Sequence, residues 1–113
     1  MKLFETQKKN DYIIIVGCGR LGANLASTLS DENGNVLIMD TNKDSFRRLS
    51  SDFGGLSVVG NGTDLDALKN AQIEKASAVI AVTNDDNTNI MVVQLAREMF
   101  RVKRVIARQV DAD

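Results

Sequence analysis

Histidine and proline are absent from this chain of 113 residues, and cysteine and tyrosine occur once each. A single cysteine, Cys18, cannot form an internal disulfide, and without histidine or a second cysteine nearby it suggests no metal or redox site. We interpret it as a small residue that fills space. The sequence also has no signal-peptide pattern and no run of about 18 apolar residues. It therefore predicts a soluble, cytoplasmic chain, whose membrane role would pass through a partner or through segments outside this sequence.

An excess of charge of either sign is also missing. The 14 basic and 15 acidic side chains give a formal net charge of −1. Surfaces that hold nucleic acid neutralise phosphates with clustered lysine and arginine, so we expect no nucleic-acid partner. The length suits one compact domain without a separate substrate domain, and a hydrophobic content of 43% is sufficient for a core.

Short apolar runs alternate with helical patterns along most of the chain. This alternation is typical of βαβ units, and it predicts a Rossmann-like α/β fold with a doubly wound parallel sheet between two helical layers. Residues 1–11 are interpreted as a polar lead-in and residues 12–113 as the domain. The predicted strands are Tyr12–Val16, Asn35–Met39, Leu56–Gly60, Ala78–Val82 and Arg104–Ala107.

Helices are predicted between these strands from the spacing of apolar residues. The second of them is expected over Thr41–Asp52, and Asn33-Gly34 and Gly54-Gly55 are expected to end the first two in the left-handed conformation. The apolar residues expected to face the sheet are Leu21, Leu25 and Leu29, then Phe46 and Leu49, then Ile90, Val93 and Met99.

The most informative motif is YIIIVGCGRLG at residues 12–22, in which an apolar strand leads directly into G-x-G-x-x-G. Gly17 would allow a tight turn, Gly19 would let the backbone approach a pyrophosphate, and Gly22 would pack the helix against the strand. A generic glycine turn would look similar. Arg20 lies at the start of the helix, where a phosphate would explain a cation, although a solvent-exposed arginine is the alternative.

The second predicted strand ends close to Asp40, near the roughly 20-residue offset expected for a ribose partner. Its carboxylate would accept hydrogen bonds from both ribose hydroxyls and would repel a 2′-phosphate, which favours NAD over NADP. Capping of the following helix is the competing interpretation, because aspartate is a preferred N-cap residue.

Polar loops follow the next two strands. In GNGTD at residues 60–64, small residues would permit close approach of a flat base, while Thr63 or Asp64 would cap the next helix. Turn and capping chemistry alone would explain the same residues.

In TNDDNTN at residues 83–89, ligand contacts are expected near the end of the fourth strand, although Asp86 or Asn87 capping the following helix would explain much of the run. Arg108 follows the fifth strand and is expected to point into the same crevice, whereas the other cations between residues 97 and 104 suit a solvated helix end.

Taken together, GCGRLG, Asp40, GNGTD, TNDDNTN and IARQVD resemble the KTN/RCK N-terminal domain, the TrkA-N nucleotide-binding module of potassium transporters and channels. The resemblance covers about residues 12–111. It implies a regulatory subunit or domain that binds NAD(H) or an adenine nucleotide (AMP, ADP or ATP), assembles into dimers or rings, and gates a membrane potassium transporter or channel by a conformational change. It also implies a location at the inner face of the membrane, through that partner.

The resemblance further implies which residues contact the ligand. The glycine loop would hold phosphates, with Arg20 nearest the end that differs between ligands, and Asp40 would hold the adenosine ribose. Residues 61–64 would border adenine, residues 83–85 would face the distal part, and Arg108 would complete the cleft. The full set is Gly17, Gly19, Arg20, Leu21, Gly22, Asp40, Thr41, Asn61, Gly62, Thr63, Asp64, Thr83, Asn84, Asp85 and Arg108. The chain stops at Asp113, before the last strand, the last helix and the smaller C-terminal ligand domain that the family usually has.

An NAD-dependent oxidoreductase fragment is the competing function. Such an enzyme needs an acid or base beside the nicotinamide, and this chain has no histidine. Its one tyrosine, Tyr12, begins the first strand at the edge away from the crevice, so we expect no catalytic residue. A P-loop NTPase is excluded because G-x-x-x-x-G-K-[ST] does not occur. An S-adenosylmethionine methyltransferase and a scaffold that has lost its ligand stay open as alternatives.

Overall fold

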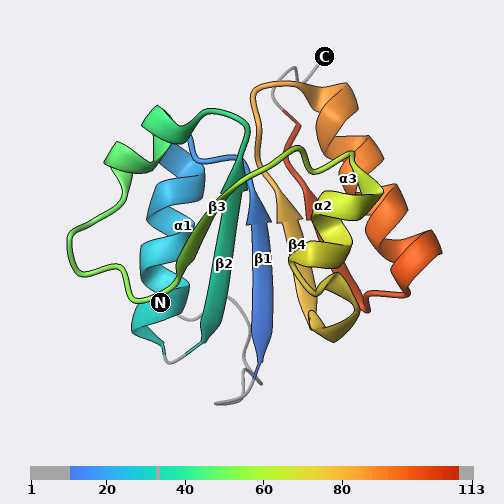
Figure 1. Ribbon diagram of the computed structural model, residues 1–113, viewed down its shortest axis with the longest axis horizontal. Coiled ribbons are helices and arrows are strands. Elements are labelled where there is room, and N and C mark those ends of the chain that lie inside the picture. Colours follow the sequence, from blue (N-terminus) through green and yellow to red (C-terminus); the bar gives the residue numbers. More distant parts are fainter. Residues whose placement is uncertain (1–10, 33, 110–113) are drawn as a thin grey trace.

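Five parallel strands form one sheet in the computed structural model, which describes residues 11–32 and 34–109. Along the sheet the order is β3-β2-β1-β4-β5 (Figure 1). The strands are β1 Tyr12–Val16, β2 Asn35–Asp40, β3 Leu56–Val59, β4 Ala78–Ala81 and β5 Arg104–Ala107. The predicted doubly wound sheet is therefore confirmed. Most of the predicted lead-in and residues 110–113 lie outside the described residues.

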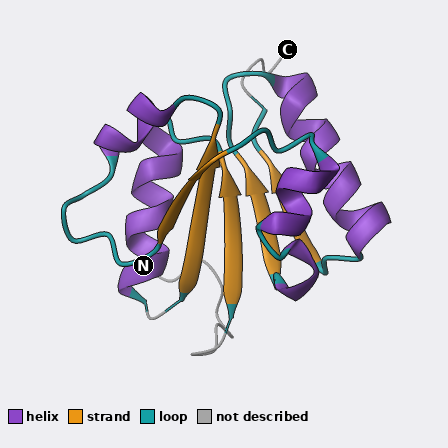
Figure 2. Ribbon diagram, viewed as in Figure 1, coloured by secondary structure: helices purple, strands orange, loops and turns teal. Residues whose placement is uncertain are grey.

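Helices cover both faces of this sheet (Figure 2). The α-helices are α1 Arg20–Asp31, α2 Leu65–Asn70 and α3 Asp86–Phe100, and two short 3₁₀ helices are η1 Lys43–Arg48 and η2 Ile73–Lys75. Residues of α1 and η1 pack with one face of the sheet, and residues of α2, η2 and α3 pack with the other. No helix within the described ranges is long and apolar enough to cross a membrane.

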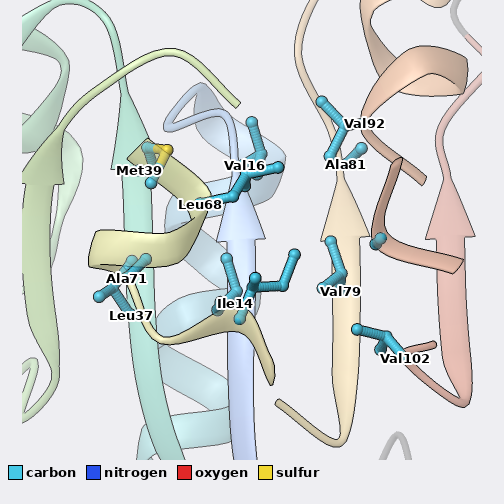
Figure 3. Close-up of a cluster of buried hydrophobic side chains, with 12 residues drawn as sticks. Ile14, Val16, Leu37, Met39, Leu68, Ala71, Val79, Ala81, Val92 and Val102 are labelled. Carbon is cyan, nitrogen blue, oxygen red and sulfur yellow. The ribbon is translucent and has the colours of Figure 1, made fainter. Parts of the chain in front are cut away.

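The central strand β1 contributes to two separate cores. Ile14 and Val16 belong to the core beneath α2 and α3, whereas Ile13 and Ile15 belong to the core beneath α1. Figure 3 shows the first of these cores, with Ile14 and Val16 on the strand between β2 and β4. Because successive side chains point to opposite faces and both faces are covered, β1 is a continuous apolar run in the sequence.

Of the apolar stripe predicted for α1, Leu29 is buried and Leu25 packs against the core as expected, but Leu21 does not face the sheet. Leu21 is 41% exposed, and the buried residues are Gly22, Ala23, Ala26 and Leu29. The reason is the close approach of the helix to the preceding turn: a Cβ on Gly22 would lie 1.9 Å from the carbonyl oxygen of Gly17. No side chain therefore fits at residue 22, and the other buried residues of the first two turns, Ala23 and Ala26, are also small.

The stripe of α3 was also partly wrong. Ile90 is 48% exposed and Met99 is 59% exposed, although Val93 is packed against the core as expected. The residues of this helix that are buried are Asn89, Val92 and Ala96. These buried residues also recur at helical spacing. The periodicity of the sequence is therefore compatible with two adjacent faces of α3, and it does not decide which of them is buried.

The predicted helix over Thr41–Asp52 is limited to the 3₁₀ helix η1, which is followed by Leu49 in an extended conformation. Gly54 and Gly55 lie beyond it, and neither has the left-handed conformation expected of a helix end. Gly55 is instead required by space, because a Cβ there would lie 2.4 Å from the carbonyl oxygen of Val36. Asn33 lies outside the described residues.

Candidate nucleotide-binding site

A cleft of about 430 Å³ lies at the carboxyl edge of the sheet, above β1, β2 and β4. At this point the chain order changes direction along the sheet, which is where open α/β sheets bind ligands. The volume is within the range of small-molecule sites. The predicted residues that line it are Gly17, Gly19, Asp40, Thr41, Asn61, Gly62, Thr83, Asn84 and Asp85.

The three glycines of the motif meet different surroundings. Gly17 has a φ of +110°, and a Cβ on it would lie 2.8 Å from the backbone nitrogen of Thr83. Gly22 lies against the Gly17 carbonyl, as described above. A Cβ on Gly19 would meet no described atom within 4 Å, so this residue opens directly onto free space beside the cleft. Gly17 and Gly22 thus have the turn and packing roles predicted for them.

The amino end of α1 faces this turn without a side-chain cap. Gly19 is the N-cap residue and has no side chain to accept hydrogen bonds from the first N–H groups, and the first turn carries no acidic residue. In contrast, Asp64 caps α2 and Asp85 caps α3 through side-chain hydrogen bonds. Among the described α-helices, α1 is the one whose first N–H groups are left for solvent or an anion.

The carboxylate of Asp40 joins the glycine turn to the end of β2. Its Oδ2 accepts a hydrogen bond of 2.8 Å from the backbone N–H of Cys18, and its Oδ1 accepts one of 2.8 Å from that of Asn42. Asp40 does not cap the following helix, because Asn42 does so by accepting from Asp44 N–H at 3.0 Å. Each carboxylate oxygen keeps a further lone pair for another donor.

The cleft is also lined by residues that we did not predict as ligand contacts, and three of them, Cys18, Ser45 and Arg48, contact one another. The full set is Val16, Cys18, Met39, Ser45, Arg48, Gly60, Val82 and Thr88. The buried Cys18 thiol donates to the Ser45 carbonyl at 3.4 Å, and Arg48 Nη1 donates to the Cys18 carbonyl at 3.5 Å. Burial raises the pKa of the Cys18 thiol, the charge of Asp40 raises it further, and Arg48 opposes them. A thiol held in its neutral form is a poor nucleophile, which agrees with a space-filling role.

The loop after β3 is ordered by its own side chains. Asn61 Oδ1 accepts hydrogen bonds from Thr63 N–H at 2.9 Å and from the Thr63 hydroxyl at 2.8 Å. Gly62 is buried, and a Cβ on it would lie 2.6 Å from Val16 Cγ1 and 3.1 Å from Val92 Cγ2. Gly62 therefore lets the loop lie directly on the core at the cleft floor.

In the loop after β4, the capping residue differs from the two that we predicted. Asp85 caps α3 by accepting from Asn87 N–H at 2.9 Å and from Thr88 N–H at 3.4 Å. Asp86 and Asn87 lie inside the helix. Asp85 both caps α3 and lines the cleft. A capping role therefore does not exclude a ligand contact at this position.

The remaining predicted residues do not line the cleft. Arg20 and Leu21 are exposed on the first turn of α1, and Arg108 is partly buried with its backbone N–H bonded to the Ala81 carbonyl at 2.8 Å. The full set outside the lining is Arg20, Leu21, Gly22, Thr63, Asp64 and Arg108. The sequence motifs therefore converge on one edge of the sheet, but only some of their side chains reach the cleft.

A parallel sheet with a glycine turn, an uncapped helix and an oriented carboxylate at its switch point defines a Rossmann-like domain of the nucleotide-binding class. The family model described as TrkA-N domain matches residues 13–113. The chain belongs to this family.

Similarity to individual proteins agrees with this assignment. The chain is 48% identical over 100 residues to the Trk system potassium uptake protein TrkA of Streptomyces coelicolor, which covers 88% of this chain and 45% of that protein. It thus spans less than half the length of that relative.

Two solved structures share the fold. The TrkA-N domain of the Escherichia coli inner membrane protein ybaL superposes with a TM-score of 0.76 at 23% identity, over 88% of this chain and 73% of that one. The Shewanella denitrificans Kef CTD in its AMP-bound form superposes with a TM-score of 0.75 at 22% identity, over 89% of this chain and 60% of that one.

Proposed function

We propose that this chain is the nucleotide-binding domain of a potassium uptake regulator. It binds NAD(H) or an adenine nucleotide in the cleft and passes the effect of binding to a membrane potassium transporter or channel. Ligand identity would act through different affinities for two arrangements of the assembled protein, without chemical conversion of the ligand. The potassium uptake named for the Streptomyces relative supports the process, and the AMP named for the Kef structure supports the ligand class.

One observation carries the proposal: an oriented carboxylate stands directly beside an uncapped helix N-terminus. Two backbone N–H groups fix both oxygens of Asp40, and Gly19 leaves open space at the start of α1. A phosphate at that N-terminus would receive backbone N–H groups and the favourable helix dipole. A ribose attached to it would present its hydroxyls to the remaining lone pairs of Asp40.

The rest of the ligand would follow the loops along the sheet edge. Adenine would lie against Asn61 and Gly62, and the distal part of a longer ligand would face Thr83, Asn84 and Asp85. Several residues that the family resemblance implies as ligand contacts do not line the cleft. To touch a ligand they would need long side chains, or the ligand would have to extend beyond the cleft. Arg20 is such a residue, since it begins at the first turn of α1 and would reach a second or third phosphate.

The composition of the cleft supports binding over catalysis. In the part of the chain that the structure describes, its lining contains no histidine, lysine or tyrosine. Tyr12 lines a different cavity, together with Gly34, Gln72 and Lys75. The titratable side chains of the cleft are a neutral thiol, Asp40, Asp85 and Arg48. A hydride-transfer enzyme would need an acid or base near the nicotinamide. The two carboxylates in this lining are already bonded to backbone N–H groups, Asp40 to those of Cys18 and Asn42 and Asp85 to those of Asn87 and Thr88.

We also propose that the domain acts as a dimer or ring at the inner face of the membrane. Large apolar side chains on α3 and β5 are exposed in the single chain: Ile90, Met91, Met99 and Ile106. Such side chains favour contact with another protein surface when they gather on one side of a domain. Sedimentation of the purified chain would measure its oligomeric state, and a monomer at all concentrations would contradict this part of the proposal.

Calorimetric titration with AMP, ADP, ATP, NAD and NADH tests the ligand site. Asp40→Ala should weaken every ribonucleotide by at least about tenfold, because charge-assisted hydrogen bonds to the ribose would be lost. Asp52→Ala removes the same charge from an exposed position outside the cleft and should bind as the wild type does. Equal affinities in all three proteins would refute the site. If no nucleotide binds or raises the melting temperature, the domain is a scaffold without a ligand.

A further inference from the structure

Asn89 is a fully buried polar residue on the first turns of α3. Its Oδ1 accepts hydrogen bonds from the Thr83 backbone N–H at 2.9 Å and from the Thr83 hydroxyl at 2.6 Å. Its Nδ2 donates to the Thr83 carbonyl at 3.1 Å and to the Arg108 carbonyl at 3.0 Å. These four bonds use both lone pairs and both protons of the amide.

The partners of this amide follow two neighbouring strands. Thr83 comes shortly after β4 and lines the cleft, and its backbone nitrogen is 2.8 Å from the position of a Cβ on Gly17. Arg108 comes directly after β5, and its own N–H is bonded to the Ala81 carbonyl. One side chain of α3 therefore holds the part of the cleft that lies next to the glycine turn and also holds the end of the edge strand.

Other residues at this place would not make the same bonds. The neighbouring buried positions of α3, Val92 and Ala96, are apolar, and an apolar side chain at residue 89 would leave the polar groups of Thr83 without these partners. An aspartate of the same shape would place a carboxylate oxygen against the carbonyls of Thr83 and Arg108, where Nδ2 now donates. Only an amide supplies acceptor and donors in this arrangement.

We propose that Asn89 is a positioning residue of the nucleotide cleft, which holds Thr83 in place for the ligand and couples Thr83 to Arg108 at the end of β5. A ligand that contacts the loop after β4 would then steady the edge strand through one buried amide. This inference rests on the proposed function. Asn89 itself would touch no ligand, and its bonds to Thr83 and Arg108 would connect the cleft to the edge of the sheet.

Asn89→Asp tests this inference, with Asn87→Asp as the matched control. Asn87 is exposed, lies two residues away on the same helix, and undergoes the same chemical change. We expect Asn89→Asp to bind ADP at least about tenfold more weakly than Asn87→Asp. Hydrogen exchange at the Arg108 amide should slow on ADP addition in the wild type and in the control, and this slowing should be lost in Asn89→Asp.

A second variant keeps the test decisive if Asn89→Asp does not fold. Thr83→Val removes the hydroxyl that bonds to Asn89, together with the contacts of that hydroxyl with the Asp85 backbone, and leaves both main-chain bonds between Thr83 and Asn89 in place. It should lower ADP affinity by a smaller factor, about two- to fivefold, and Thr83→Ser should restore it.

A purely structural role would lower the melting temperature of Asn89→Asp while leaving the ADP affinity of the folded protein and the exchange response at Arg108 unchanged. That result would overturn the inference and leave the proposed function intact. If the wild type itself binds no nucleotide, the proposed function fails first and the positioning role fails with it.

Discussion

Replacing each glycine of the turn by alanine should separate the residues that build the fold from the residue that admits a ligand. At Gly19 an added Cβ would meet no described atom within 4 Å, and a φ of −81° with a ψ of −166° suits any amino acid. At Gly22 the added Cβ would lie 1.9 Å from a backbone oxygen. At Gly17 an alanine would have to adopt a φ of +110°, which residues with a side chain rarely do. We expect Gly19→Ala to fold and the other two variants to be destabilised.

The expected magnitudes follow from these contacts. For Gly19→Ala, a gain of about 0.4–1 kcal/mol from the restricted unfolded chain is offset by roughly 0.5–1 kcal/mol, because alanine is a poorer N-cap residue. For Gly17→Ala, strain at positive φ costs about 1–3 kcal/mol, and overlap with the backbone of Thr83 adds to it. For Gly22→Ala, the closest overlap is with the backbone carbonyl of Gly17, which cannot move aside as a flexible side chain could. The cost therefore reaches or exceeds the roughly 1–3 kcal/mol of ordinary overpacking.

Thermal melting followed by circular dichroism, together with calorimetric titration, measures both effects in the same samples. Gly17→Ala and Gly22→Ala should melt on the order of 10 °C lower than the wild type, and Gly19→Ala should melt within a few degrees of it. Gly19→Ala should nevertheless bind ADP and NAD at least about tenfold more weakly, because its methyl group occupies the space that a phosphate would use. Wild-type affinity in Gly19→Ala, or wild-type melting in Gly22→Ala, would refute this assignment of roles.

Three further predictions concern the charged groups and the thiol around the cleft. Arg48→Ala should weaken the binding of all anionic nucleotides in calorimetry, whereas Arg47→Ala, an exposed neighbour outside the lining, should leave it unchanged. Arg20→Ala should chiefly weaken ligands with more phosphates, so equal losses for AMP and ATP would contradict its proposed place. Because burial raises the pKa of the Cys18 thiol, the thiol keeps its proton to a higher pH in the folded state than in the unfolded state. Urea unfolding should therefore show stability falling as pH rises above the ordinary thiol pKa of about 8.5, with a smaller fall in Cys18→Ala. An identical pH dependence in both proteins would exclude this contribution from Cys18.

Strand positions were the best-predicted part of the fold. The bounds of β1 and β5 agree with the prediction, and the other three strands differ from it by one residue at their ends. These segments were predictable because each is a short, mainly apolar run bounded by turn residues, and the inner strands are buried on both faces. The parallel direction of the strands was predictable from the alternation of strands and helices along the chain.

Helix faces were predicted less well, because the apolar spacing did not choose between adjacent stripes. Leu21 and Ile90 fit the periodicity of their helices and are nevertheless exposed. How closely a helix approaches the sheet decides which stripe is buried, and at α1 that distance depends on the contact of Gly22 with the Gly17 carbonyl. Such a contact depends on two elements together, so neither segment predicts it alone.

The cleft was predicted as a place but only partly as a set of residues. Loops that follow neighbouring parallel strands meet at one edge, so the motifs after β1, β2, β3 and β4 predicted its position. Arg48 could not be found in this way, because it is 30 residues from Cys18 in sequence and belongs to no motif. Asn89 was part of the polar run after β4, but its contact with Arg108 joins residues that are 19 positions apart.

The sequence by itself determined the family, the parallel sheet and the edge of the sheet at which a ligand would bind. These properties depend on local signals: apolar runs, glycine spacing and the residues that end strands. Only the tertiary structure decided that Asp40 orients the glycine turn, that Gly19 alone of its three glycines opens onto free space, and that Asn89 joins two strand ends. Those properties depend on distances between segments far apart in the chain, which the folded packing sets and which no local pattern contains.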